Sequence, residues 1–596
     1  MKKENTKKSM SLAKAFFRLL PEIYKPAPMT FIFLIIITII HGVSWGLQTL
    51  LTEHLFDRAA DFALHKITFS AVVLALIFLV LSQMASQILN GLGNYIPMAL
   101  FDKVKGAQSV SIHEKMSRLA PVCFEDTDIL DNINKAEEGK NNAGWFIGGI
   151  LTVFIFYGPY FLFMSFYLYR VKPILAVAIP LIFLPTLATQ LLRAKVFSKL
   201  EDKAAPIRRE FDYYESCMVG REYYKETRIL GAFSFFRKQY HDALVLLNKL
   251  TLKTHLKANL AELSMKLLSL AGYVMILLML FDALMKKEIS VGAFAAVFAS
   301  IGMLFALMDE LICSHFAGIA QNFGTIQNYI NFMDLPEREG SREPLPQGTD
   351  IYLENVSFAY PGAEDNAVEN VSFTIHNGET VAVVGENGSG KSTLVRLITG
   401  LYLPNYGDVL YGDVNTKKVS MKSLFEKTSA VFQKYQRYQM TLRDNIQISD
   451  VDKNSEDEML DKICTQTGAD KNDESYPNGY DTMLSREFDG VDLSGGQWQR
   501  IAIARSFFRE HNLIVLDEPT AAIDPLEETK IYNRFAEAAK DKTAVIVTHR
   551  LGSVRLADKI LVMKSGKLVQ CGSHEELIAR DGEYSQLYKA QEQWYN

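Results

Sequence analysis

The sequence predicts a membrane protein in two parts: a six-helix transmembrane domain with long cytoplasmic helical extensions, followed by an α/β domain with a phosphate-binding loop. Two observations support this division. Long apolar runs fill roughly the first 330 residues, and the remainder has the composition of a soluble α/β protein. A glycine-rich turn between an apolar strand and a helix begins at Gly385. A chain of 596 residues is also too long for a single hydrophobic core.

Charge and cysteine content narrow the classes of function. The chain has 63 basic and 68 acidic residues, so nothing in its balance indicates a nucleic-acid-binding surface. Its five cysteines are scattered, odd in number and without the spacing of a metal site. We expect them to be reduced thiols.

Residues 1–28 form a basic N-terminal segment with seven lysines and arginines against two glutamates. Residues 10–20 have the pattern of a short amphipathic helix that lies on the inner leaflet. The apolar segment that follows is long enough to span a bilayer and lacks a small-residue cleavage site, which argues against a secretory signal peptide. The positive charge predicts a cytoplasmic N-terminus, and six spans then return the C-terminus to the cytoplasm.

Residues 29–333 contain six apolar runs, each near the ~20 residues that cross a bilayer. We expect spans at 29–51, 68–95, 145–169, 173–192, 265–284 and 291–312. The outer loops would then be 52–67, 170–172 and 285–290.

The other two connections between spans, 96–144 and 193–264, are long and charged. The charges of 193–264 recur at helical spacing, which predicts that this connection consists of helices that continue beyond the membrane. Residues 334–349, with several prolines and charges, are expected to be a linker, and 350–596 to be the α/β domain.

The glycine-rich turn has the context that phosphate binding requires. An apolar run at 381–384 precedes it, and a helical pattern at 394–398 follows. Glycines allow successive backbone N–H groups to point at phosphate oxygens, and the helix start adds partial positive charge. Lys391 can reach the β- and γ-phosphates, and the Ser392 hydroxyl suits Mg²⁺. The predicted nucleotide-binding residues are Gly385, Glu386, Asn387, Gly388, Ser389, Gly390, Lys391, Ser392 and Thr393.

Two further residues fit the same site, although neither is diagnostic alone. Tyr360 lies upstream in Phe-Ala-Tyr-Pro-Gly and can stack on an adenine ring, an interaction worth ~1–3 kcal/mol in other base-binding sites. Gln433 follows an apolar strand, where its amide can contact both Mg²⁺ and an attacking water.

Three motifs follow downstream. Leu-Ser-Gly-Gly-Gln at 493–497 opens a helix with a hydroxyl and bare backbone N–H groups, which predicts a second anion site at Ser494, Gly495, Gly496 and Gln497. An apolar strand at 513–516 ends in Asp517, which suits Mg²⁺, and Glu518, which suits a general base. Asp524 is the last residue of the short segment 519–524 that follows this pair, and His549 ends another strand that we expect to be buried.

In this order the motifs resemble the ATP-binding-cassette family over about residues 351–580. The resemblance implies that ATP and Mg²⁺ are the cofactors. Its catalytic residues would be Glu518, His549 and Gln433, and its metal ligands Ser392, Gln433 and Asp517. It also implies that two cassettes pair head to tail, with ATP clamped between the phosphate loop of one and Ser494 and Gly496 of the other. Tyr360, Gly495, Gln497 and Asp524 belong to the same nucleotide-binding set.

The membrane half resembles the exporter-type half-transporters of that family. Residues 124–130 and 225–228 fall where their coupling helices would lie, and 433–439 and 485–488 are similar to bacterial multidrug and peptide exporters. The expected function is ATP-driven export of an amphipathic small molecule or peptide by a dimer in the plasma membrane of a bacterium. A metal-chelate importer and an ATP-gated channel or sensor subunit stay open as alternatives, as do homodimer and heterodimer.

Polar side chains within the spans are candidates for the transport path. His41, Trp45 and Gln48 share one helical face of the first span, and we expect this face to line a cavity or pack on a neighbour. Asp309 and Glu310 in the sixth span either lie in the same path or sit at the membrane edge in solvent.

Overall fold

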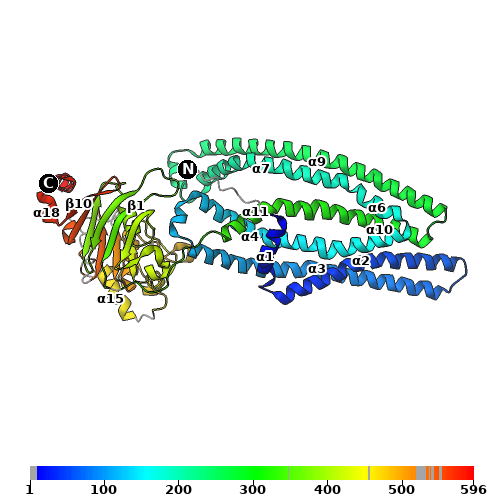
Figure 1. Ribbon diagram of the computed structural model, residues 1–596, viewed down its shortest axis with the longest axis horizontal. Coiled ribbons are helices and arrows are strands. Elements are labelled where there is room, and N and C mark those ends of the chain that lie inside the picture. Colours follow the sequence, from blue (N-terminus) through cyan, green and yellow to red (C-terminus); the bar gives the residue numbers. More distant parts are fainter. Residues whose placement is uncertain are drawn as a thin grey trace. The chain divides into compact units, whose positions relative to one another are not determined.

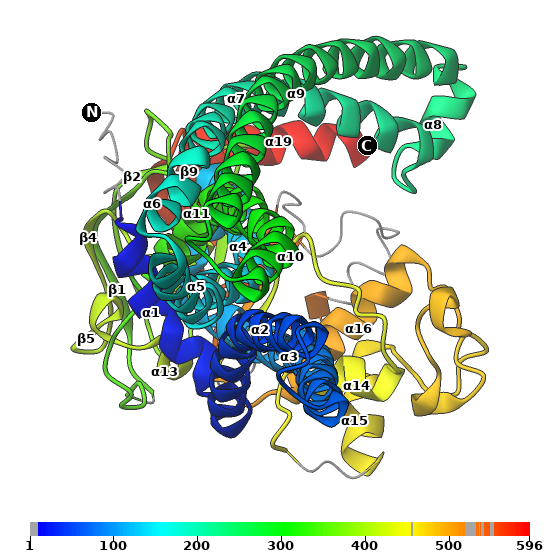
Figure 2. The same cartoon turned by 90° about the vertical axis from the view of Figure 1, so that its right-hand side faces the viewer.

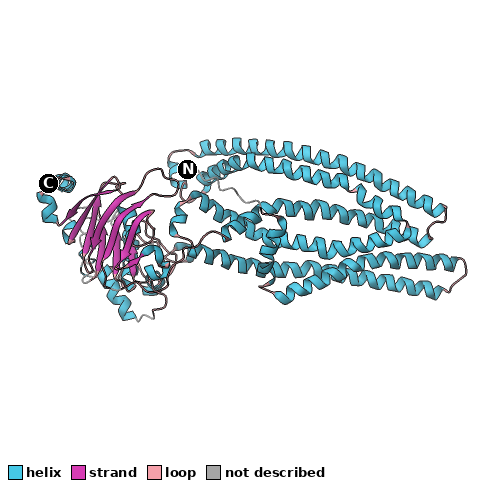
Figure 3. Ribbon diagram, viewed as in Figure 1, coloured by secondary structure: helices cyan, strands magenta, loops and turns pink. Residues whose placement is uncertain are grey.

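The computed structural model describes residues 10–346, 348–453, 457–518, 532, 533, 535, 537, 542–548 and 553–595. The chain divides into two compact units. The first unit comprises Met1–Met116 with Asp131–Leu335, and the second comprises Ser117–Leu130 with Pro336–Asn596. The first unit is helical, whereas every described strand lies in the second (Figure 3).

Six helical stretches of the first unit are long and apolar enough to cross a membrane. They are Pro28–Ala63, Phe69–Arg118, Asn132–Val171, Pro173–Gln190, Phe233–Met285 and Val291–Met333. Each expected span overlaps one of them, so the prediction of six membrane-spanning helices is confirmed. A short amphipathic helix, α1 (Leu12–Tyr24), precedes them and buries Ala15, Leu19 and Ile23.

The charged connection 193–264 is helical, as expected, and most of 96–144 is helical too. α3 (Phe69–Arg118) continues far past its apolar part. α7 (Leu184–Val219) and α9 (Phe233–Met285) run side by side over much of their length (Figures 1 and 2) and are joined through α8 (Tyr224–Ile229). An ion pair between Arg193 and Glu262 ties α7 to α9.

One expected loop is wrong, and one expected span has a break that was not predicted. Residues 52–67 are not a loop, because α2 (Pro28–Ala63) continues through most of them. The added turns are held by Glu53, which pairs with Arg170 at 2.8 Å, and by Asp57, which accepts the Gly292 N–H at 2.8 Å. The fourth span is divided into α6 (Pro173–Ile182) and α7, because Pro185 starts a new helix where its missing N–H costs no hydrogen bond.

Two spans contain π-helical turns that meet each other. η2 (Val153–Tyr157) joins α4 (Thr127–Thr152) to α5 (Gly158–Val171), and η3 (Leu311–Phe316) joins α10 (Val291–Glu310) to α11 (Ala317–Met333). The ring of Tyr157 packs edge-on against His315 at 5.3 Å. Such turns insert an extra residue into a helix and occur frequently at functional sites.

The second unit is built on two sheets. The larger has the order β10-β9-β3-β8-β7-β6, in which β10 alone is antiparallel to its neighbour. Its strands are β3 (Thr380–Gly385), β6 (Thr428–Val431), β7 (Leu513–Asp517), β8 (Thr543–Val547), β9 (Lys559–Lys564) and β10 (Lys567–Gly572). The antiparallel sheet β2-β1-β4-β5 comprises β1 (Ile351–Phe358), β2 (Val368–Ile375), β4 (Tyr406–Tyr411) and β5 (Val414–Asn415).

The main core of this unit lies between the two sheets around α12 (Lys391–Ile398), and the central parallel strands are fully buried. A second core gathers three helices, α14 (Leu442–Gln447), α15 (Asp457–Thr467) and α16 (Gly495–Phe508). The remaining helices of the described residues are η1 (Pro121–Glu125), α13 (Met421–Phe425), α18 (His574–Ala579) and α19 (Glu583–Tyr595), with short 3₁₀ turns between elements.

Candidate nucleotide site

The phosphate loop lies between β3 and the first turn of α12, as the sequence predicts. Its glycines adopt backbone angles that other residues disfavour, with φ of +149° at Gly385, +80° at Gly388 and +98° at Gly390. A Cβ atom on Gly390 would lie 2.4 Å from the carbonyl oxygen of Ala367, so a side chain is excluded there. Glu386 and Asn387 are exposed in the loop. The tight turn therefore presents backbone N–H groups ahead of a helix start, the arrangement that binds phosphate.

Lys391 is held inside the loop that it belongs to. Its side chain is 5% exposed, and its Nζ donates to the carbonyl oxygens of Gly385 at 2.9 Å and Glu386 at 3.0 Å. The same nitrogen lies 3.6 Å from Oε1 of Glu518. The ammonium group thus stands between the loop and the acidic pair.

Five predicted site residues from three motifs converge at the carboxyl ends of the parallel strands. Ser392 donates through Oγ to Oδ1 of Asp517 at 3.1 Å. Gln433, just beyond β6, donates through Nε2 to Oε2 of Glu518 at 3.0 Å. Parallel strands place their carboxyl ends at one edge, and this edge is the usual binding crevice of such sheets. The arrangement brings a hydroxyl, an amide, a lysine and two carboxylates together.

The two carboxylates are almost fully enclosed, with Asp517 2% and Glu518 8% exposed. Burial raises the pKa of Asp517, and the neighbouring charge of Glu518 adds to this effect, whereas the hydrogen bond from Ser392 opposes it. Glu518 also adopts a φ of +43°, an unfavourable angle for a residue with a side chain, while its N–H donates to Val547 at 3.0 Å. Buried negative charge with local strain is typical of a functional site.

The donor set fits Mg²⁺ in company with phosphate. Hydroxyl, amide and carboxylate oxygens are hard ligands of the kind Mg²⁺ prefers, and it commonly takes one or two carboxylates together with substrate phosphates. Within the described residues, no group of three His, Cys, Asp or Glu side chains could hold a metal alone. Ser389 also supports a bound group at this site, because its buried Oγ has no hydrogen-bond partner in the described part of the chain.

Tyr360 lies beside the start of α12. Its hydroxyl is 3.0 Å from Oγ1 of Thr393 and accepts a hydrogen bond from Nη1 of Arg396 at 2.8 Å. Arg396 also stacks on Tyr402, whose hydroxyl donates to Glu125 of η1. Sequence reasoning missed Arg396 and Tyr402, because no local pattern marks them. Their connection joins Tyr360 to residues 117–130, which contain all of one expected coupling segment, 124–130.

The Ser494–Gln497 motif forms the start of α16. Ser494 accepts the Gln497 N–H through Oγ at 3.3 Å, and the Gln497 side chain accepts the Ser494 N–H at 2.8 Å. This reciprocal capping box leaves Gly495 and Gly496 in the first helical turn. The hydrogen bonds found for Ser494 and Gln497 within the described chain do not reach the phosphate loop. Asp524 and His549 lie outside the described residues.

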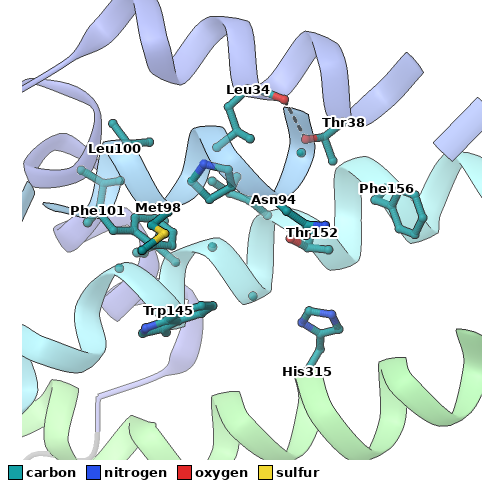
Figure 4. A pocket seen from close by; sticks show the side chains of 18 of the residues that line it. Leu34, Thr38, Asn94, Met98, Leu100, Phe101, Trp145, Thr152, Phe156 and His315 are labelled. Carbon is teal, nitrogen blue, oxygen red and sulfur yellow. Dashed lines mark hydrogen bonds between the residues drawn. The ribbon is translucent and has the colours of Figure 1, made fainter. Parts of the chain in front are cut away.

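The first unit contains a separate cavity of about 890 Å³ (Figure 4). His41, Trp45 and Glu310 line it, whereas Gln48 and Asp309 do not. Asp309 instead pairs with Lys266 at 3.1 Å. The aromatic residues of the third span also fall into two groups. Phe156 and Tyr157 line the cavity, whereas Phe154 and Phe166 are largely exposed on the surface.

Comparison with known proteins finds similarity to ABC transporters. Residues 368–521 match the family model described as ABC transporter. The subtilin transport ATP-binding protein SpaT of Bacillus subtilis is 33% identical over 374 residues, which cover 61% of this chain and 60% of that protein. An ATP-dependent lipid A-core flippase of Haemophilus ducreyi is 35% identical, covering 54% of this chain and 55% of that protein. The nisin transport ATP-binding protein NisT of Lactococcus lactis is 35% identical, covering 49% and 51%.

The fold comparison extends over nearly the whole chain. A solved structure of a bacterial Atm1-family ABC exporter with ATP bound superposes with a TM-score of 0.73 at 20% identity, covering 93% of this chain and 98% of that one. The resemblance to ATP-binding-cassette exporters is therefore confirmed in the cassette sequence and in the fold. The sequence matches span 60%, 55% and 51% of the length of the three curated relatives. The match at 368–521 is to an ABC transporter domain, which implies that the second unit takes ATP with Mg²⁺ as cofactors.

Proposed function

We propose that this chain, which has the fold and the cassette of an ATP-binding-cassette exporter, is one half of an ATP-hydrolysing transporter. It exports an amphipathic small molecule or peptide by alternating access. The supporting relatives are named for transport of subtilin and nisin and for flipping lipid A-core. The six apolar helices form the translocation path, and the cassette supplies the energy.

The convergence of Lys391, Ser392, Gln433, Asp517 and Glu518 carries this proposal. Bound Mg²⁺ would neutralise developing charge on the phosphates. Ser392, Asp517 and Gln433 would hold the ion, and Lys391 would turn its ammonium from the loop carbonyls toward the phosphate oxygens. Glu518 orients the attacking water and accepts its proton, while Gln433 fixes the carboxylate by the hydrogen bond it already makes.

The partner is a second half-transporter, either another copy or a related chain. One cassette supplies the phosphate loop, and Ser494 and Gly496 of the other close over the nucleotide. Asp524 and His549 belong to the same composite site. The protein lies in the plasma membrane of a bacterium with both termini in the cytoplasm, an orientation supported by the basic residues before the first span.

ATP hydrolysis by the purified chain in lipid, beside a Glu518→Gln variant, tests this function. We expect the substitution to lower turnover by about 10²–10⁴-fold, because a general base typically contributes that much. Glu510→Gln, which changes an exposed acid paired with Lys427, serves as the matched control and should retain activity. Turnover that survives in Glu518→Gln would remove Glu518 from the mechanism.

A further inference from the structure

The cavity of the first unit is walled by several helices and has an aromatic interior. α2 contributes Leu34 and Thr38, and α3 contributes Asn94, while Trp145 and Thr152 come from α4 (Figure 4). His315 reaches toward them from the opposite wall (Figure 4). A volume of about 890 Å³ is in the range of sites for small molecules.

Both π-helical turns contribute to this cavity. η2 supplies Phe156 and Tyr157, and η3 supplies His315. The ring of Phe156 lies 5.0 Å from that of His41 and 5.8 Å from that of Trp45. The extra residue in each turn changes the direction in which its side chains leave the helix, and both turns contribute aromatic rings to the cavity lining.

His41 provides an unsatisfied polar group in the lining of the cavity. The residue is 7% exposed, and its Nε2 has no hydrogen-bond partner in the described part of the chain. Buried polar atoms almost always have a partner, so this nitrogen is an unsatisfied polar group beside the cavity.

The charges that line the cavity are those of Asp102, Lys105, Lys140 and Glu310. Lys140 pairs with Glu137, and Asp102 and Lys105 are one helical turn apart on α3, where opposite charges offset each other. Glu310 has no Lys or Arg within ion-pair distance among the described residues, and its neighbours in the cavity are the Tyr157 hydroxyl and the His315 ring. One carboxylate of the lining therefore has no Lys or Arg partner among the described residues and lies beside a phenol hydroxyl and an imidazole.

We infer that this cavity binds an amphipathic cation, with Glu310 as its counter-charge. The positive group lies between Glu310 and the rings of Phe156, Tyr157 and Trp45, which attract cations through their faces. The apolar body of the ligand packs against Leu34 and Phe101. The inference rests on the proposed function only in that the bound cation would be the transported molecule.

Two probes of the same shape and opposite charge test the site, tetraphenylphosphonium and tetraphenylborate. Their binding is measured without ATP on the full chain in lipid nanodiscs, by the fluorescence of Trp45 and Trp145. The wild-type chain should bind the cation more tightly than the anion. Glu310→Gln should weaken cation binding by about tenfold or more, the effect of removing a charged partner, and leave the anion unaffected or tighter.

Asp309→Asn is the matched control, because Asp309 is adjacent in sequence, paired with Lys266 and outside the cavity. It should bind the cation within about twofold of wild type. Equal loss in both variants, or an unchanged cation affinity in Glu310→Gln, would overturn the inference. If Glu310→Gln does not fold, the wild-type comparison decides, since an anion that binds as tightly as the cation also overturns it.

The Glu518→Gln variant separates this inference from the proposed function. Its cation affinity without ATP should equal that of wild type. A Glu310-dependent site in a chain whose ATP turnover survives Glu518→Gln would leave the site standing and contradict the proposed mechanism. ATP turnover that depends on Glu518, in a chain whose cavity binds both probes equally, would support the proposed mechanism and contradict the cation site.

Discussion

Asp517 illustrates the conflict between stability and function within a single residue. Its carboxylate is enclosed beside Glu518, and burial raises its pKa above the ordinary value of 3.8. A raised pKa in the folded state means that the charged form is disfavoured by folding. The destabilising contribution is therefore fully present above the folded-state pKa and disappears as the pH falls below 3.8.

We expect Asp517→Asn to leave the nucleotide-free protein as stable as wild type or more stable at pH 7, because an amide in this position carries no buried charge and still accepts from Ser392. The difference in melting temperature from wild type should shrink as the pH is lowered through the folded-state pKa. Mg²⁺-dependent ATP turnover should nevertheless fall at least about tenfold, since a charged ligand contributes about 1.5–3 kcal/mol. A lower melting temperature at pH 7 would contradict the assigned pKa direction.

At the scale of the element, two helix starts with the same capping chemistry offer a natural comparison. Ser494 and Gln497 cap α16, and Ser573 and Glu576 cap α18, each with the two reciprocal hydrogen bonds of a capping box. Replacement of either serine by alanine should cost about 1 kcal/mol of stability, the usual value for an N-cap.

Only Ser494→Ala should also reduce ATP turnover, because the proposed composite site uses the Ser494 hydroxyl to contact the nucleotide of the partner cassette. Ser573→Ala removes an equivalent cap without touching that site. Thermal melting and ATP hydrolysis of the two variants are measured side by side. Equal turnover in both would assign Ser494 a capping role alone.

A glycine on α2 permits the close approach of the π-helical turn η2. A Cβ atom at Gly42 would lie 2.5 Å from the carbonyl oxygen of Phe156, whereas one at Gly91 of α3 would meet no atom within 4 Å. Gly42→Ala should therefore destabilise the chain by about 1–3 kcal/mol, as overpacking does. Gly91→Ala should leave the melting temperature nearly unchanged. Equal melting of the two variants would mean that α2 and η2 do not approach as closely as described.

At the scale of the whole molecule, pairing of two cassettes predicts complementation. Lys391→Ala disables a phosphate loop, and Ser494→Arg disables the surface that closes over the loop of the partner. Each variant alone should lose most ATP turnover, since both sites of its homodimer are damaged. A chain of one kind paired with a chain of the other retains one intact site.

Co-expression of the two variants with different tags, followed by sequential purification on both tags, isolates the mixed dimer. Its ATP turnover should exceed that of either parent. Turnover no higher than the parents would contradict a site shared between cassettes in this head-to-tail manner.

The sequence by itself determined the features that depend on local pattern. Six apolar runs of bilayer length predicted six spanning helices, because helix length and apolar composition are properties of a short stretch of chain. The strand, glycine turn and helix around Gly385 likewise identified the phosphate loop, since its conformation requires particular residues at particular positions. The helical continuation of the charged connection 193–264 was readable for the same reason.

Tertiary structure decided what depends on contacts between distant segments. Asp309 and Glu310 are equivalent in sequence, yet only packing separates an acid paired with Lys266 from one that lines a cavity. The helical turns after residue 51 could not be foreseen, because their partners Arg170 and Gly292 lie on other helices. The enclosure of Asp517, the π-helical turns and the unsatisfied nitrogen of His41 arise in the same way: burial and pairing are set by neighbours that no short stretch of sequence specifies.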